Sequence, residues 1–428
     1  MVKYSSRLLI IWLSLLPVMI RFCPGLQAEE DYVPELKPYE IIQSGFQSRF
    51  WVVRSFAAIR AGRNNDLNSL RVLLNQYDSD SHERVKAFAL QAISRYDRDF
   101  LVMAFDSERV SQWVNLTIDK NAFIAAEALV TLRVLFEKPK LPKKPRVIFN
   151  YWKKQEGIYP RYREKLLQKF NKTEAGVQPL PLPSARALKD GETKEQLENE
   201  HMRSVVPEGF GDYIRRLEMY GIYMCVLLDD TSSMDRVIDE TRQRILGIMG
   251  LMKEITPKYQ MAFVTYKDRV NKVFNFESEP GKIFEFLKGV KARGGADDKE
   301  GPDKALDCVL NSPRITWNQR AVKAITIIGD MPPHDRDRKK MLALARKAVE
   351  KDITVNAIGT YRRKSGMAED VPFFQEIAAA GNGIYSRLEE FDELLQKLLQ
   401  LSVGPKYQGF INPFLITLIE LRAGDLKK

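Results

Sequence analysis

Residues 226–234 read Val-Leu-Leu-Asp-Asp-Thr-Ser-Ser-Met, and this stretch decides the fold. An apolar run typical of a buried strand stops at Asp229, after which Thr231 and Ser233 occupy alternate positions. Ligands of an open parallel sheet bind at the carboxyl ends of its strands, so the pattern predicts an oxygen-lined pocket. Carboxylate and hydroxyl oxygens suit a hard divalent cation such as Mg²⁺.

A second apolar, β-branched run, Lys323–Asp330, ends in an aspartate about one hundred residues later and is followed by Met-Pro-Pro-His. Helical patterns separate the two runs. This order predicts two neighbouring strands of one sheet, with Asp229 and Asp330 at the same edge.

Here the sequence resembles the von Willebrand factor A family. Its metal-ion-dependent adhesion site combines Asp-x-Ser/Thr-x-Ser, followed by Met, with an Asp at a later strand end. The matching residues are Asp229, Thr231, Ser233, Met234 and Asp330, and the resemblance covers roughly residues 220–402. It implies an α/β fold, a bound Mg²⁺ (or Mn²⁺ or Ca²⁺), and a protein partner whose Asp or Glu completes the metal shell.

The loop Ala292–Asp298 lies where many members of the family carry a metal-contacting Thr, and it contains no hydroxyl. A branch of the family carries Asp after the Gly pair instead, so the resemblance implies Asp297, with Asp298 as the alternative. A third carboxylate bound directly would neutralise a divalent ion, whereas contact through water would leave it more Lewis acidic. The sequence leaves both modes open.

Helix capping is the competing explanation for these polar residues. Thr231 or Ser232 could serve only as the N-cap of the helix that follows, and Asp297 and Asp298 could cap the helix Pro302–Leu310.

Strand and helix patterns alternate through the predicted domain, residues 216–402. Near-continuous apolar strands and helical connections predict a doubly wound, mostly parallel sheet flanked by helices. The expected strands are Ile222–Asp229, Gln260–Tyr266, Val270–Glu277, Ala324–Gly329, Thr354–Gly359 and Gly383–Leu388, the second and third forming a hairpin. The expected helices are Asp235–Ile255, Lys282–Val290, Pro302–Leu310, Arg338–Lys351, Phe373–Ala380 and Phe391–Leu401.

The N-terminus has the layout of a secretory signal peptide, residues 1–28, with basic residues before the apolar run Leu8–Ile20. An uncleaved anchor is the alternative, but thirteen apolar residues fall short of the ~20 needed to span a bilayer. Cleavage after Ala28 would leave Cys225 and Cys308, which read as buried apolar residues. The net charge of +11 would fall to nearer +8.

Residues 29–137 are predicted to be helical. Val53–Ala57 resembles Val85–Ala89 and, more faintly, Ile124–Ala128, a spacing similar to HEAT-type helical repeats. An irregular helical bundle is the alternative. Asp80 followed by Glu83 predicts a capping box.

Residues 138–215 read as a basic, proline-marked linker. Its cations, interleaved with aromatic residues, could bind a polyanion, but a solvated face is the more frequent use of such a run, and nucleic acid is not expected. Gln178–Ser184 predicts a stiff connector and Lys189–Glu200 a short helix. In the extension 403–428, Ile411–Leu421 is too short to span a membrane, so it packs against the protein or a partner.

These features predict an exported, metal-dependent module for protein–protein interaction or adhesion that is not an enzyme. The alternative is a metal-assisted hydrolase in which His334, just after Asp330, acts as acid or base beside the cation.

Overall fold

The computed structural model describes residues 38–155, 157–173, 192–294, 301–360, 371–388 and 407–426. Four predicted features lie outside these residues: the signal peptide, the connector Gln178–Ser184, the pair Asp297 and Asp298, and the helix Phe391–Leu401.

A six-stranded sheet in the order β3-β2-β1-β4-β5-β6 confirms the predicted α/β fold. Its strands are β1 Ile222–Asp229, β2 Tyr259–Tyr266, β3 Val270–Glu277, β4 Val322–Gly329, β5 Thr354–Thr360 and β6 Tyr385–Leu388. All neighbouring strands pair in parallel except β2 and β3, which form the predicted antiparallel hairpin. The central strand β1 pairs on both sides, with β2 and β4, so the end of β1 lies between two other strand ends.

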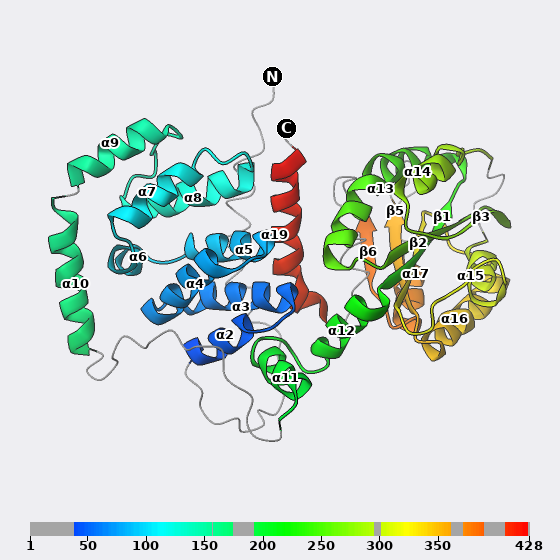
Figure 1. The fold of residues 1–428 in the computed structure, drawn as a ribbon. Helices are drawn as coiled ribbons and strands as arrows, with labels where there is room; N and C mark the ends of the chain where they lie inside the picture. Colours follow the sequence, from blue (N-terminus) through cyan, green and yellow to red (C-terminus); the bar gives the residue numbers. More distant parts are fainter. Residues whose placement is uncertain are drawn as a thin grey trace. The chain divides into compact units, whose positions relative to one another are not determined.

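Helices cover both faces of the sheet (Figure 1). One layer holds α13 Asp235–Ile255 and α14 Pro280–Lys288, and the other holds α15 Pro302–Asn311, α16 Asp335–Glu350 and α17 Val371–Ala380. Successive side chains of β1 point to opposite faces, so Met224 and Val226 join the first layer while Cys225 and Leu227 join the second. Cys225 is buried and Cys308 half-buried, and neither forms a disulfide.

The described chain before the sheet is helical, which was predicted for residues 29–137. Its helices are α2 Pro38–Phe46, α3 Trp51–Asn64, α4 Leu67–Ser79, α5 Glu83–Ile93, α6 Arg98–Ala104, α7 Ser107–Leu116, α8 Ala122–Leu135, α9 Pro145–Gln155, α10 Tyr159–Thr173, α11 Lys194–Val205 and α12 Phe210–Tyr220. The HEAT-like interpretation and the boundaries at 137, 215 and 402 stay predictions. Helices α9, α10 and α11 lie within the stretch read as a linker, and α12 begins in it and ends at Tyr220. Thr193 and Gln196 form a capping box at the start of α11.

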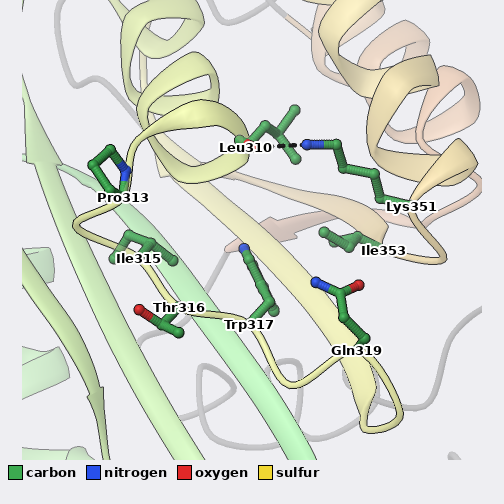
Figure 2. Close-up of a pocket in the computed structure, with 8 residues that line it drawn as sticks. All are labelled: Leu310, Pro313, Ile315, Thr316, Trp317, Gln319, Lys351 and Ile353. Atoms are coloured by element: carbon green, nitrogen blue, oxygen red, sulfur yellow. Dashed lines mark hydrogen bonds between the residues drawn. The ribbon is translucent and has the colours of Figure 1, made fainter.

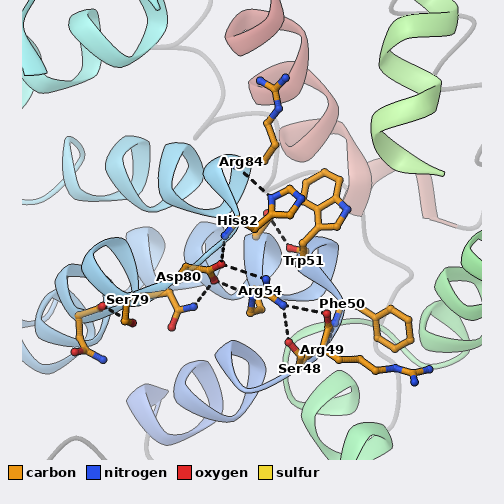
Figure 3. Close-up of polar contacts among 12 residues, drawn as sticks. Ser48, Arg49, Phe50, Trp51, Arg54, Ser79, Asp80, His82 and Arg84 are labelled. Carbon is orange, nitrogen blue, oxygen red and sulfur yellow. Dashed lines mark hydrogen bonds and ion pairs between the residues drawn. The ribbon is translucent and has the colours of Figure 1, made fainter. Parts of the chain in front are cut away.

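The capping box predicted from Asp80 and Glu83 is wrong. His82 is the N-cap of α5, and its ring accepts a hydrogen bond from the backbone N–H of Arg84 (Figure 3). Asp80 instead forms a buried ion pair with Arg54 of α3 at 2.8 Å. Burial alone would raise the pKa of Asp80, but hydrogen bonds from Arg54 and the His82 backbone outweigh it and hold this pKa below its ordinary value.

The C-terminal helix α19, Gln408–Leu426, packs against α3, α5 and α8, so the extension contacts the helical part of the chain. Phe414 is fully buried and stacks on Phe56 and Phe88, each at 5.1 Å between ring centroids. The Asn121 side chain, which also caps α8, donates to the backbone oxygen of Leu421 at 3.1 Å. Within the described residues, no helix combines the length and apolar character needed to cross a membrane.

We expect Phe414→Ala to lower the free energy of unfolding by about 3–5 kcal/mol, since it removes a buried ring and leaves a cavity. Ile416→Ala is the matched control, because Ile416 lies on the same helix and is 42 % exposed. Urea unfolding of both variants measures the difference. Equal stability of the two variants would contradict the docking of α19.

Candidate metal site

A chain of hydrogen bonds at the end of β1 organises three of the predicted metal ligands. The Oδ1 atom of Asp229 accepts from the backbone N–H of Thr231 at 2.9 Å and from its hydroxyl at 2.7 Å. The Thr231 and Ser233 hydroxyls lie 3.1 Å apart. Asp229 is fully buried, whereas Ser233 is exposed, so the chain runs from the core of the sheet to the surface.

The capping alternative for Thr231 and Ser232 is wrong. Residues Ser232–Met234 form a short 3₁₀ turn, and Met234 occupies the N-cap position of α13. Thr231 occupies the N-cap position of the 3₁₀ turn, but neither helix start has a side-chain cap hydrogen bond. The Thr231 hydroxyl donates to Asp229. Met234 is buried, and its sulfur receives a hydrogen bond from the Thr360 hydroxyl at the end of β5.

The parallel register between β1 and β4 brings Asp330 to the same edge of the sheet. Leu228 is level with Ile328, so β4 reaches Gly329 where β1 reaches Asp229, and Asp330 follows. A Cβ atom at Gly329 would lie 3.6 Å from the Oδ2 atom of Asp229 and 2.7 Å from the Tyr266 hydroxyl. A side chain at position 329 would therefore collide with the Tyr266 hydroxyl, whereas glycine accommodates it beside the carboxylate.

Three buried carboxylates at this edge each have one oxygen with no hydrogen-bond partner among the described residues: Asp229 Oδ2, Asp230 Oδ1 and Asp330 Oδ1. Burial raises the pKa of Asp229 to about 7, and the negative charges of Asp330 and Asp230 add to the shift, against the opposing hydrogen bonds from Thr231. Since a buried anion without a partner is costly, the donor set fits a bound cation.

Asp230 is a feature that the sequence interpretation missed. Its backbone N–H donates to the oxygen of Tyr266, its backbone oxygen accepts from Arg293, and its Oδ2 accepts from the Asn271 side chain. Asp230 thus joins the end of β1 to β2, to β3 and to the loop that begins at Ala292, the third loop of the site. The adjacent residues Asp229 and Asp230 were the available signal in the sequence. The alternate spacing with Thr231 and Ser233 indicated only Asp229 as a ligand.

The third loop reaches the site at Gly294, whose backbone oxygen accepts from the backbone N–H of Ser232 at 3.1 Å. Asp297 and Asp298, the predicted further ligands, lie outside the described residues, which resume at Gly301. Gly301 occupies the N-cap position of α15, so neither aspartate does.

His334 occupies the N-cap position of α16, and its backbone oxygen accepts from Asp337 at 2.7 Å.

Within the described ranges, no three His, Cys, Asp or Glu side chains form a group able to hold a metal. The two predicted carboxylates that are described would therefore depend on hydroxyl groups, water or the undescribed loop to complete a coordination shell.

A pocket of about 420 Å³ lies at the opposite, amino end of the sheet (Figure 2). Trp317 and Gln319, which precede β4, line it together with Ile353, which precedes β5. Its one lysine, Lys351, donates to the backbone oxygen of Leu310 at 2.7 Å. The residues that line this pocket include no Asp or Glu, unlike the edge of the sheet that carries Asp229 and Asp330.

Comparisons with known proteins identify this fold. The model of the von Willebrand factor type A domain family matches residues 224–401. This part of the chain is a von Willebrand factor type A domain, which confirms the resemblance. Domains of this kind typically mediate protein–protein interaction without catalysis. A comparison with curated protein sequences gives no match.

Three solved structures are similar to the chain, each over 42 % of its length. They are the conserved hypothetical protein BatB from Bacteroides thetaiotaomicron (17 % identity, 99 % of that chain, TM-score 0.32), an aerotolerance-related membrane protein from Bacteroides fragilis NCTC 9343 (17 %, 98 %, 0.33), and the SpRpn10 VWA domain (14 %, 96 %, 0.34). Scores this low carry no argument about function.

The raised pKa of Asp229 predicts how stability depends on pH. Between its ordinary pKa of 3.8 and about 7, the folded protein holds a proton at Asp229 that the unfolded chain releases. In chelator, the free energy of unfolding should therefore fall as pH rises through this window, by at most about 4 kcal/mol.

Urea midpoints at both ends of the window, measured for the wild type and Asp229→Asn, test this expectation. Because Asn does not titrate, the variant should lose this component of the pH dependence. An identical pH dependence in both proteins would contradict the assignment.

Proposed function

We propose that residues 216–402 bind a divalent cation, Mg²⁺ before Mn²⁺ or Ca²⁺, and use it to capture a protein partner. Asp229, Thr231, Ser233 and Asp330 supply oxygens directly or through water. Asp297, or Asp298 in its place, contributes from the third loop. The bound ion supplies positive charge that attracts an acidic group of the partner.

The observation that carries the proposal is the pair of buried, unpartnered oxygens on Asp229 and Asp330. Among the described residues, neither carboxylate forms an ion pair with Lys, Arg or His. A divalent cation would offset both charges and give both oxygens a partner.

A partner carboxylate fits the remaining chemistry. We take the contact of Asp297 or Asp298 to run through water, which leaves Asp229 and Asp330 as the directly bound carboxylates. Oxygen ligands from Thr231 and Ser233 are neutral, so the ion keeps affinity for a further anionic oxygen. Ser233 is exposed at the end of the hydrogen-bond chain, which is where such a group would approach.

The N-terminal sequence supports export of the module through cleavage after Ala28.

No specific observation favours the alternative function, a metal-assisted hydrolase that uses His334. His334 occupies the N-cap position of α16, and its backbone oxygen accepts a hydrogen bond from Asp337. We therefore assign no catalytic step to this edge of the sheet.

The metal proposal predicts that Mg²⁺ binds the wild type with measurable heat in isothermal titration and raises its melting temperature, chiefly above pH 7, where Asp229 is ionised. Asp229→Ala should abolish both effects, because it removes the central buried oxygen ligand. His334→Ala should retain them.

Asp212→Asn is the matched control. It removes one exposed carboxylate from α12, the helix that leads into the opposite end of β1, and should bind Mg²⁺ like the wild type. No metal-dependent heat in the wild type, or equal heat in Asp229→Ala, would refute the metal proposal.

The partner proposal predicts that acidic peptides from a random library are retained in Mg²⁺ and released by chelator, with enrichment of Asp and Glu. Thr231→Val should weaken retention about tenfold or more, since it removes a neutral ligand and the hydrogen bond to Asp229. Retention without dependence on Mg²⁺ would show that the metal does not mediate capture.

A further inference from the structure

The charge of this chain is concentrated in one short segment. Residues 138–172 contain twelve Lys and Arg against two Glu, a net charge of +10. The whole chain carries +11, so the other 393 residues together carry only +1. The metal site does not use this segment.

Helix α9 presents cations on the side opposite its packing face. Ile148 and Trp152 are buried one turn apart, and Trp152 stacks on Phe136 at 5.8 Å. Arg146, Lys153 and Lys154 are exposed. The buried stripe holds the helix against α7 and against Phe136, which follows α8, so its charged face has a fixed direction.

Helix α10 is anchored in the same way. The Tyr162 hydroxyl donates to Asp99 of α6 at 3.1 Å, and Arg163 donates to the backbone oxygen of Met103 at 3.1 Å. Arg161 and Lys165, one turn apart, are exposed. We call the exposed Lys and Arg side chains of residues 138–165 the basic face; among the described residues, they form no ion pair.

Bulky apolar side chains lie among these cations. Ile158 is 64 % exposed in the short connection between α9 and α10, three residues before Arg161 and four after Lys154. Val147 is 44 % exposed beside Arg146. Exposed apolar residues flanked by lysines combine the two forces that hold a protein on an anionic bilayer, burial at the headgroup boundary and attraction to the lipid charge.

We propose that the basic face docks the protein on a membrane surface rich in anionic phospholipid, with Ile158 entering the headgroup layer. Nine of the twelve cations are Lys, a compact point charge suited to delocalised attraction rather than to forked recognition of individual groups. Nucleic acid is the weaker fit, because Trp152 and Tyr159 are buried where base stacking would need them exposed.

The experiment is co-sedimentation of the full chain with vesicles of phosphatidylcholine alone or with one-third phosphatidylglycerol. Binding should require phosphatidylglycerol and weaken sharply between about 0.1 M and about 0.5 M NaCl. The triple variant Lys153→Gln, Lys154→Gln, Lys165→Gln should bind about a hundred-fold more weakly, since each Lys near an anionic surface contributes about a factor of five. Ile158→Ser should lose about tenfold.

A second triple variant, Lys253→Gln, Lys339→Gln, Arg346→Gln, removes three exposed cations from helices beside the sheet and should bind like the wild type. All variants share the same N-terminal segment, so differences between them report on the basic face. Equal loss in both triple variants would overturn the proposal. So would absence of vesicle binding alongside tight binding of a labelled oligonucleotide.

Discussion

The buried carboxylate of Asp229 is the constraint on which the candidate site depends. It lies at the end of the central strand β1, where neighbours on both sides exclude water. Thr231 satisfies one of its oxygens and the other has no partner in the described part of the chain. Burial raises its pKa to about 7, so near neutral pH the group is poised between protonated and charged forms. A cation at this position would favour the charged form.

The surroundings of Asp229 preserve that situation. Gly329 accommodates the Tyr266 hydroxyl on one side, and Asp230 joins the strand to its neighbours through Tyr266 and Asn271. Such backbone and side-chain contacts hold the loop without consuming the free oxygen of Asp229. The site therefore depends on the contacts of Asp230 with Tyr266 and Asn271 as well as on Asp229 itself.

The protein carries two surfaces of opposite electrostatic character. Acidic side chains lie at the edge of the sheet. Residues 138–172, which include the basic face, carry +10 of the chain's net charge of +11. A metal-dependent contact and a lipid contact would use separate residues and respond differently to chelator and to salt. Each surface can thus be disabled without altering the other.

Sequence alone predicted the six strands, the hairpin and the convergence of Asp229 and Asp330 at one edge, because apolar periodicity and strand-end polarity are local properties. Tertiary structure decided the rest. Asp80 pairs with Arg54 while His82 caps α5, Asp230 connects β1 to neighbouring segments, and α19 packs against the helical part of the chain through Phe414. Each outcome depends on residues far apart in the chain, whose meeting no local pattern encodes.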